Sequence, residues 1–290
     1  MTDRQSDYDH WAWLYDRTVG PAYGRQQMAF LERVMLPRLP AGAQVLDLCC
    51  GTGQVMGLLA ARGCKVTGLD GSADMLAHAR ENAPGASLVQ GDALSFDLGR
   101  RFDAVVCTSA SLNHMPGLDA LSQVFARVAA HLDEDGVFVF DVNHPAQMRR
   151  YWRGQPAEGE IGAEHAWLIT PRIDSATGAG SFTVDIWRRE GAAPLPLHRR
   201  ALHRLMGWHR LERARLRRLA RFARHAPGWR HAAITYSVHG HELDEVTRAL
   251  EAAGFDVSLE TIDASGPPDE RHSAHFVCTR RAEPARRMAV

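Results

Sequence analysis

The chain has 290 residues, of which 45% are hydrophobic and 23% are charged, and its 34 basic and 34 acidic residues balance to a formal net charge of zero. These values are ordinary for a folded globular protein and exclude wholesale disorder. The neutral balance also argues against a chain that is basic throughout, as many nucleic-acid coat proteins are. Lys65 is the one lysine among the basic residues, and this arginine bias most simply reflects a GC-rich coding genome.

The N-terminal residues and the cysteines favour a cytoplasmic protein. Residues 1–7 are polar and lack the apolar core of a secretory signal. No apolar run approaches the ~18 residues that a membrane helix needs, so we expect no membrane association. Five cysteines, an odd number without a CxxC pair, suit a reducing compartment and argue against a disulfide framework or a cysteine zinc site.

The first half of the chain predicts a helical cap followed by a parallel sheet. Residues 1–40 are rich in aromatic residues and helix formers. Residues 41–143 alternate short apolar runs with amphipathic stretches, which is typical of parallel strands joined by crossover helices. Ser72 has the residue type and position of a helix N-cap. The strands are expected at 45–48, 66–69, 87–90, 103–107 and 136–142, and the helices at 55–62, 72–82 and 118–132.

Residues 144–240 break this alternation, and we interpret them as an inserted lid or substrate-binding subdomain. Strands are expected at 166–171, 181–187 and 231–238. The stretch 197–230 holds eleven arginines against one glutamate, with apolar residues at roughly helical spacing. The alternation resumes in residues 241–290, where a helix at 242–253 and strands at 255–262 and 275–279 would complete the core sheet.

A glycine turn after the first strand carries the main chemical signal. Gly51 and Gly53 lack Cβ atoms, so the backbone can turn tightly and a ligand can approach it. In doubly wound sheets such a turn lies where the strand order reverses and nucleotides bind. Asp70 ends the second strand, where it could accept hydrogen bonds from both hydroxyls of a ribose. An NAD fingerprint would need a third glycine in place of Met56, and Asp47 would repel a pyrophosphate but suits a ligand with an ammonium group.

These features resemble the class I S-adenosylmethionine-dependent methyltransferases. The resemblance runs in order through residues 45–55, 66–80, 90–93, 102–115 and 132–143. It implies a Rossmann-like, doubly wound α/β sheet of seven strands with the last strand antiparallel. It also implies S-adenosyl-L-methionine as cofactor and S-adenosyl-L-homocysteine as product. The implied cofactor contacts are Asp47, Cys49, Gly51 and Gly53 beside the methionine part, Asp70 at the ribose, Gly71 and Met75 at the adenine ring, and Asp92 with the Ala93 backbone at the adenine amino group.

The segment Tyr8–Asp16 resembles the opening helix of small-molecule N-methyltransferases, such as those that act on glycine or on amino sugars. The resemblance implies that this N-terminal cap folds over the cofactor. Tyr8 would then contact the cofactor and Tyr15 would lie at the reacting groups. For Trp13, a place in the hydrophobic core and a place at the site fit the pattern equally well.

The residues after the fourth strand, Thr108–Met115, lie where the transferred methyl group would point in such a sheet. The protein must align the acceptor with this group and exclude water, because the cofactor carries the reactivity. We therefore expect Ser109, Asn113 and His114 near the acceptor, with Ser109 also contacting the cofactor. His114 could act as a general base or could only position the acceptor. Weaker candidates on the same edge are Asp141, Asn143 and His144.

The predicted function is transfer of a methyl group to nitrogen or oxygen of a small molecule. In small-molecule relatives an antiparallel sheet at the place of residues 144–240 roofs the acceptor pocket. Such a roof would have an aromatic lining from Trp167, Phe182, Trp187 and Tyr236. An acceptor that carries a phosphate or a carboxylate could bind the arginine-rich stretch.

Two alternatives stay open at this point. One is an RNA methyltransferase that binds its substrate through residues 197–230, although few aromatic residues interleave with these arginines. The other is a protein that binds S-adenosylmethionine without methylating. His239, His241 and Glu242 could suggest a metal, but no further ligand at a recognised spacing accompanies them, so no metal is predicted. The sequence leaves the acceptor and the oligomeric state open.

Overall fold

The computed structural model describes residues 11–174, 176–189, 205–263 and 266–281. The chain divides into two compact units. The first unit comprises Met1–Gln147 and Gly240–Val290, and the second comprises Met148–His239. The second unit is therefore inserted in the sequence of the first.

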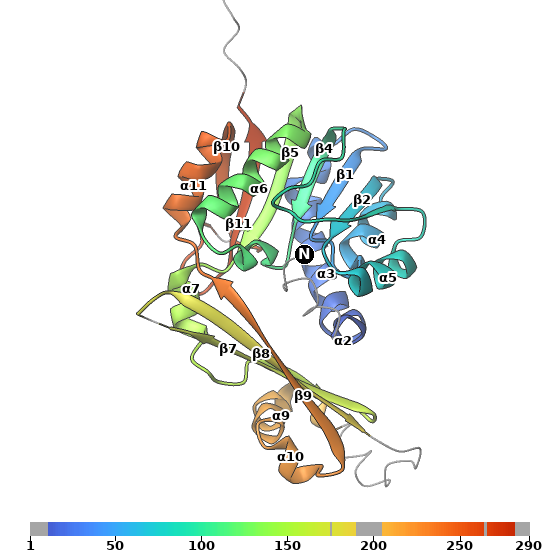
Figure 1. Ribbon diagram of the computed structural model, residues 1–290, viewed down its shortest axis with the longest axis vertical. Helices are drawn as coiled ribbons and strands as arrows, with labels where there is room; N and C mark the ends of the chain where they lie inside the picture. The colour runs from blue at the N-terminus through green and yellow to red at the C-terminus, as the bar shows by residue number, and fades with distance from the viewer. Residues whose placement is uncertain (1–10, 175, 190–204, 264–265, 282–290) are drawn as a thin grey trace, which may run out of the picture. The chain divides into compact units, whose positions relative to one another are not determined.

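A seven-stranded sheet forms the centre of the first unit, in the order β10-β11-β5-β4-β1-β2-β3 (Figure 1). The strands β1 to β5 run parallel, whereas β11 runs antiparallel to both of its neighbours, β5 and β10. This arrangement confirms the predicted doubly wound sheet with an antiparallel last strand. The strands are β1 (Gln44–Leu48), β2 (Lys65–Asp70), β3 (Ser87–Gln90), β4 (Phe102–Cys107), β5 (Leu132–Val142), β10 (Phe255–Glu260) and β11 (Ala274–Arg280).

Helices cover both faces of this sheet. The helices α3, α4 and α5 pack on one face, and α6 and α11 pack on the other (Figure 1). No helix in the described ranges has both the length and the apolar character that crossing a bilayer requires. The helices are α2 (Ala12–Arg17), α3 (Val19–Val34), α4 (Gln54–Ala60), α5 (Ala73–Asn82), α6 (Leu118–His131) and α11 (Leu243–Ala252), with short 3-10 turns η1 (Leu36–Arg38) and η2 (Ser111–His114).

The strand β5 shows why the sheet needs both layers of helices. Its side chains alternate between the two faces, and both sets are buried. Phe138 and Phe140 enter the core under α6 and α11, where the ring of Phe140 stacks on that of Phe276 with centroids 4.7 Å apart. Val137 and Val139 enter the core under α3 and α4. A strand that is apolar on both faces is stable only between two covering layers.

The predicted elements of the first unit are present, with small shifts at their ends. Ser72 caps α5 as predicted, because its hydroxyl accepts a hydrogen bond from the backbone N–H of Met75 at 3.1 Å. The helix expected over 118–132 ends at His131, and β5 begins directly at Leu132 rather than at residue 136. Leu132 pairs with Phe102 across an irregularity in the β4–β5 register, which local sequence pattern does not reveal.

The second unit is built on a four-stranded antiparallel sheet in the order β6-β7-β8-β9. The helix α7 (Pro145–Tyr151) precedes it, and neither α7 nor β6 was expected from the sequence. Between β8 and β9, residues 205–228 are described and include the short helices α9 and α10 and a 3-10 turn. The elements are β6 (Glu158–Ile161), β7 (His165–Ile173), β8 (Ala179–Arg189), η3 (His209–Leu211), α9 (Glu212–Leu219), α10 (Phe222–His225) and β9 (Trp229–His239).

The four aromatic residues that were expected to line one face of this sheet do not share a face. Phe182 and Tyr236 lie directly opposite each other on β8 and β9 and stack with ring centroids 5.1 Å apart. Trp187 is an odd number of residues from Phe182, so it points to the opposite face. There it packs against Phe222, with centroids 5.2 Å apart, in the small core that also contains Leu219.

Candidate functional site

The reversal of strand order at β1 defines where a ligand can bind in the first unit. The strand β1 lies between β2 and β4, so the chain winds outward from it in two directions. Helices of the two halves leave opposite faces of the sheet and open a crevice at the carboxyl ends of these strands. The residues that follow β1, β2, β3, β4 and β5 therefore form the candidate site.

The glycine turn after β1 adopts the conformation that its sequence requires. Cys49, Gly51 and Gly53 have positive φ angles of 58°, 53° and 79°. A Cβ on Gly53 would lie 2.8 Å from the Cα of Ala79, so α4 and α5 can meet only over a glycine. At Gly51 no atom lies within 4 Å of a Cβ position, and its requirement is conformational. The left-handed conformation of Cys49 was not expected, because cysteine rarely adopts it.

Asp70 ties this turn to the next one along the sheet. Its Oδ2 accepts a hydrogen bond from the backbone N–H of Gly51 at 2.8 Å, and its Oδ1 accepts one from the N–H of Ser72 at 2.9 Å. The carboxylate thus holds the glycine turn and the start of α5 together.

The candidate residues after β2 and β3 are joined in the same way. The side-chain amide of Gln90, at the end of β3, donates a hydrogen bond to the carbonyl of Gly71 at 3.1 Å. Met75 and Ala93 are buried, and Asp92 is partly exposed. Because β1, β2 and β3 are neighbours in the sheet, their carboxyl ends bring the predicted cofactor contacts of all three turns to one edge.

Asp47 has an unusual environment for an acidic residue. Only 2% of its surface is exposed, and its Oδ2 is buried without a hydrogen-bond partner. Burial raises the pKa of Asp47 to about 8, and the nearby charge of Asp70 contributes to this rise. A buried carboxylate with a free oxygen is costly unless a cation neutralises it. The arrangement suits a ligand that brings a positive charge to the end of β1.

The predicted acceptor loop after β4 is held in a strained turn. Ser109 and Ala110 have φ angles of 64° and 56°, which neither serine nor alanine normally adopts. The turn leads into η2, which contains Asn113 and His114. Asn113 is buried, and its amide exchanges two hydrogen bonds of 2.8 Å with the backbone N–H and carbonyl of Asn143. These hydrogen bonds of Asn113 fix the loop. His114 is partly exposed.

His144, another candidate on this edge, holds a different loop. It is buried, and its Nε2 lies 3.1 Å from the carbonyl oxygens of both Asp269 and His272. These two residues belong to the connection that leads into β11. This nitrogen therefore already has backbone partners, and nothing in these contacts brings His144 to an acceptor.

The N-terminal helix α2 is anchored to the glycine turn by a network that the sequence did not predict. Asp16 Oδ1 accepts hydrogen bonds from the amides of Gln54 at 2.9 Å and Asn82 at 2.5 Å. The amide of Asn82 also donates to the carbonyl of Thr52 at 2.7 Å, and His78 Nδ1 lies 3.7 Å from Asp16 Oδ2. The partners of Asp16 are 38 to 66 residues away along the chain, so no local pattern could have indicated them.

The aromatic residues of the N-terminal segment divide into described and undescribed ones. The ring of Tyr15 packs edge-on against the buried Trp11, with centroids 5.2 Å apart, and Trp13 is partly buried. Tyr8 lies outside the described residues. The roles of Tyr8 and Tyr15 at the cofactor and the reacting groups stay predictions.

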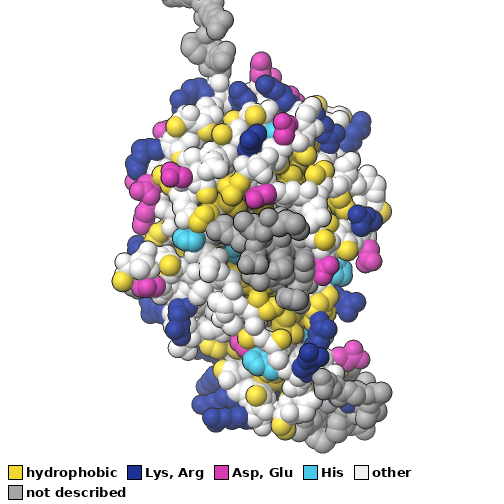
Figure 2. Space-filling model, in the orientation of Figure 1, with side chains coloured by type: hydrophobic (Ala, Val, Ile, Leu, Met, Phe, Trp, Pro, Cys, Tyr) yellow, Lys and Arg dark blue, Asp and Glu magenta, His cyan; other side chains and the backbone are white. Residues whose placement is uncertain are grey.

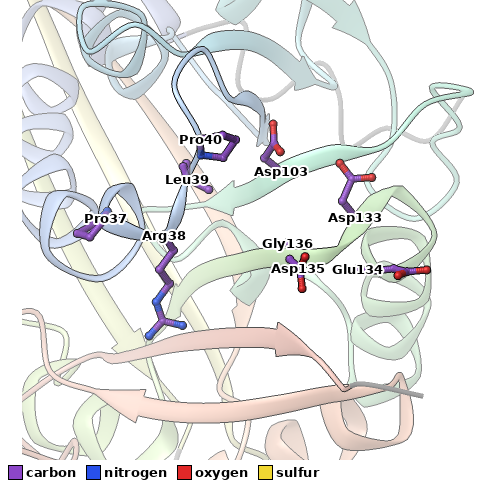
Figure 3. Close-up of a pocket in the computed structure, with 9 residues that line it drawn as sticks. All are labelled: Pro37, Arg38, Leu39, Pro40, Asp103, Asp133, Glu134, Asp135 and Gly136. Atoms are coloured by element: carbon purple, nitrogen blue, oxygen red, sulfur yellow. The ribbon is translucent and has the colours of Figure 1, made fainter. Parts of the chain in front are cut away.

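A hollow lies at the opposite edge of the sheet (Figure 3). Asp103, the second residue of β4, lies there, and its Oδ2 accepts a hydrogen bond from the N–H of Gln44, at the start of β1, at 2.7 Å. Nucleotide sites of open α/β sheets lie at the carboxyl ends of the strands, so this acidic hollow at their amino ends is not the candidate site. Its lining consists of Pro37, Arg38, Leu39, Pro40, Asp103, Asp133, Glu134, Asp135 and Gly136.

Within the described ranges, no three His, Cys, Asp or Glu side chains are grouped so that they could hold a metal ion. The fold and the site together define a doubly wound nucleotide-binding protein whose ligand carries a positive charge as well as a ribose. Comparison with known proteins agrees with this class. Residues 45–136 match the family model described as a methyltransferase domain.

Relatives and solved structures extend this match. An uncharacterized methyltransferase of Synechocystis sp. is 35% identical over 149 residues, which cover 49% of this chain and 68% of that protein. The methyltransferase CcbJ from Streptomyces caelestis has the same fold, with a TM-score of 0.70 at 20% identity over 97% of this chain and all of that one. The chain belongs to the class I S-adenosylmethionine-dependent methyltransferases.

One group of relatives has named substrates. The dTDP-3-amino-3,6-dideoxy-α-D-glucopyranose N,N-dimethyltransferase of Streptomyces fradiae is 42% identical over 141 residues, which cover 47% of this chain and 55% of that enzyme. The chain thus spans about half the length of the first curated relatives that it matches.

The burial of Asp47 predicts a pH-dependent stability. A carboxyl whose pKa is raised on folding stabilises the protein fully below its unfolded value near 4, and this contribution is lost as the pH rises toward about 8. Asp47→Asn, which cannot ionise, should therefore gain about 4 kcal/mol over the wild type between pH 5 and pH 8.5 in cofactor-free protein. Urea unfolding at the two pH values measures this gain.

The matched control is Asp256→Asn, which makes the same change at an exposed carboxylate with 64% of its side-chain surface accessible. Its difference from the wild type should be the same at both pH values. A difference between Asp47→Asn and wild type that does not change with pH would contradict the unpaired state of this carboxyl.

Proposed function

We propose that this protein transfers methyl groups from S-adenosylmethionine to the amino group of a nucleotide-linked sugar. The observation that carries the proposal is the buried Asp47 carboxylate, with its free oxygen, beside the glycine turn and Asp70. An ammonium group and a ribose are both present in S-adenosylmethionine, so the residues at this edge fit it. The amino-sugar methyltransferase of Streptomyces fradiae, 42% identical over 141 residues, supports the choice of acceptor.

In the proposed site, residues of the first three strands bind the cofactor. Asp47 faces its ammonium group, Asp70 accepts hydrogen bonds from its ribose hydroxyls, and Met75 packs on its adenine ring. Asp92, with the Ala93 backbone, binds the adenine amino group. Each of these residues lies at the carboxyl ends of β1 to β3, or at the helix that follows β2.

The bound cofactor supplies an electrophilic methyl group on a sulfonium sulfur. The residues of this chain then have to orient the acceptor amine and take up its proton. His114 is the residue that we assign to this step, since it is an imidazole that follows the strained turn after β4. We propose that Tyr15 and Ser109 flank the reacting groups, and that Asn113 acts through the loop that it fixes.

The arginine-rich stretch, residues 197–230, does not lead us to propose RNA methylation as a second function. Arg215 donates hydrogen bonds to the carbonyls of Gly159 at 2.8 Å and Met206 at 2.9 Å, so it fastens α9 within the second unit. Within residues 205–230, the arginines with exposed side chains lie at the end of this unit that carries α9 and α10 (Figure 2). They are suited to an anionic acceptor, and a nucleotide-linked sugar carries phosphates. The exposed arginines are Arg210, Arg213, Arg217, Arg221, Arg224 and Arg230.

We also propose that the protein works in the cytoplasm. All five cysteines are free thiols, and three of them, Cys50, Cys107 and Cys278, are buried. Free cysteines persist in a reducing compartment, which supports this location.

The proposed reaction is tested directly with a defined acceptor. The purified chain should convert S-adenosylmethionine to S-adenosylhomocysteine when dTDP-3-amino-3,6-dideoxy-α-D-glucose is present, and mass spectrometry should detect the N-methylated sugar. The same nucleotide sugar with a hydroxyl in place of the amine is the control and should give no product. Cofactor binding without turnover of any amino sugar would favour a protein that binds S-adenosylmethionine without methylating.

Asp70 tests the cofactor site independently of the acceptor. The loss of two hydrogen bonds from ribose hydroxyls to a carboxylate costs about 1.5–3 kcal/mol each, so Asp70→Ala should bind S-adenosylmethionine more than tenfold more weakly. Calorimetry measures the affinity, and circular dichroism checks the fold. Asp74→Ala removes an exposed carboxylate from the first turn of α5 and should leave the affinity unchanged. If Asp70→Ala and the wild type bind S-adenosylmethionine with equal affinity, the ribose does not bind at this edge of the sheet.

His114 tests the acceptor side. His114→Ala should bind S-adenosylmethionine almost as the wild type does, because the proposed cofactor contacts come mainly from the first three strands. If His114 is the general base, His114→Ala should methylate about 10²–10⁴-fold more slowly than the wild type, and its rate should no longer rise with pH. A smaller loss with an unchanged pH profile would assign it to positioning. The control His225→Ala removes an exposed histidine of α10, and a loss of rate there equal to that of His114→Ala would exclude both roles.

A further inference from the structure

The turn that presents the proposed acceptor loop has no conformational reason of its own to persist. Ser109 and Ala110 are consecutive and both left-handed, with φ angles of 64° and 56°. A left-handed conformation costs a residue with a Cβ roughly 1–2 kcal/mol. Strain of this kind persists only where surrounding groups over-determine it, and it gathers at functional sites. The question is which group holds this turn.

Asp141, the penultimate residue of β5, holds this turn through a hydrogen bond. Its Oδ2 accepts a hydrogen bond from the backbone N–H of Ala110 at 3.0 Å. Only 4% of Asp141 is exposed, and its Oδ1 is buried without a hydrogen-bond partner. The contact spans 31 residues of sequence and joins β5 to the turn after β4, which is its neighbour in the sheet. A buried carboxylate that accepts a backbone N–H forms a strong, short-range restraint.

A second restraint from the same strand end holds the other side of the loop. Asn113 exchanges two hydrogen bonds of 2.8 Å with the backbone of Asn143, two residues after Asp141. The loop from Ser109 to Asn113 is thus bound at both ends to the end of β5. His114 follows this doubly held segment directly, so its place in the loop depends on both contacts.

We propose that Asp141 is a positioning residue, which holds the left-handed turn at Ser109 and Ala110 and thereby sets the place of His114. The proposal rests on the proposed function for its link to turnover, but its structural part does not. Asp141 itself contacts the backbone of the loop through Oδ2, and we assign it no contact with the acceptor or the cofactor.

The surroundings of Asp141 make its restraint sensitive to pH. Burial raises the pKa of Asp141 to about 7, although the backbone N–H groups of Ala110 and Ser109 act to lower it. His275 lies opposite on β11, and burial lowers its pKa to about 4, so it is neutral above that pH. Cys107, on β4, has a pKa well above its usual value, partly through the charge of Asp141. Ionisation of Asp141 strengthens its hydrogen bond to Ala110, so the turn should be held more firmly as the pH rises through 7.

Hydrogen exchange measured by mass spectrometry tests the restraint without an acceptor. In cofactor-free protein, Asp141→Ala should raise exchange in peptides that cover residues 108–115, while the central strands keep wild-type protection and S-adenosylmethionine affinity stays within about threefold. The exposed-site control Asp256→Asn should leave the loop unchanged. After correction for intrinsic rates, loop protection in the wild type should increase from pH 6 to pH 8, whereas in Asp141→Asn it should not.

A double variant separates this role from a general need for a buried acid. Ala110→Gly removes the left-handed strain, so it should restore most of the loop protection that Asp141→Ala loses. With dTDP-3-amino-3,6-dideoxy-α-D-glucose as the probe, Asp141→Ala should lower kcat about 10–100-fold with little change in the cofactor affinity, and Ala110→Gly should recover part of it. If Asp141→Ala does not fold, Asp141→Asn with and without Ala110→Gly gives the same comparison.

Two results would overturn the proposal. One is unchanged exchange of residues 108–115 in both Asp141 variants. The other is a loss of protection that spreads over the whole sheet, together with a lower melting temperature and no rescue by Ala110→Gly. If the exchange results are as expected but no amino sugar is methylated, the restraint stands and the proposed function fails.

Discussion

The buried carboxylate of Asp47, which has a free oxygen at the end of β1, is the constraint around which the candidate site is organised. Burial of an ionised carboxylate is unfavourable, and it raises the pKa of Asp47. A second acid, Asp70, lies close enough to add to this effect. Within the described residues, no cation of the protein is bound to the free oxygen of Asp47. The site therefore suits a ligand that places a positive charge beside Asp47, whereas a pyrophosphate at this position would add repulsion.

The two sides of the site are held by different means. On the side of β1 to β3, Asp70 accepts a hydrogen bond from the N–H of Gly51 and the amide of Gln90 donates one to the carbonyl of Gly71, and two of the three left-handed residues after β1 are glycines. On the side of β4 and β5, both left-handed residues, Ser109 and Ala110, carry a Cβ, and the buried Asp141 of β5 accepts a hydrogen bond from the N–H of Ala110. Both sides need paired strands, because each of these restraints comes from the strand next to the turn that it holds. The second side adds backbone strain at both of its left-handed positions.

The parts of the fold that the sequence predicted correctly share one property, which is that each is encoded in a short segment. The alternation of apolar strands and amphipathic helices indicated the sheet, and the glycine turn followed by Asp70 indicated the binding edge. Ser72 at the start of α5 was predicted from residue type and position, and its hydroxyl has the expected partner. Trp187 was expected on the same face of the sheet as Phe182. It lies an odd number of residues from Phe182 along β8, so it points to the face that α9 and α10 cover.

From periodicity and from motifs within a few residues, the sequence by itself indicated a parallel sheet covered by helices and a glycine turn at its binding edge, and its resemblance to the class I methyltransferases implied the cofactor. Only the tertiary structure revealed that Asp141 holds the turn after β4, that Asn113 is bound to the backbone of Asn143, and that Asp16 anchors α2 to the glycine turn. These contacts join groups 30 to 66 residues apart. A side chain's residue type does not specify which distant backbone atom it will meet, and that choice is made when the strands pair and the helices pack.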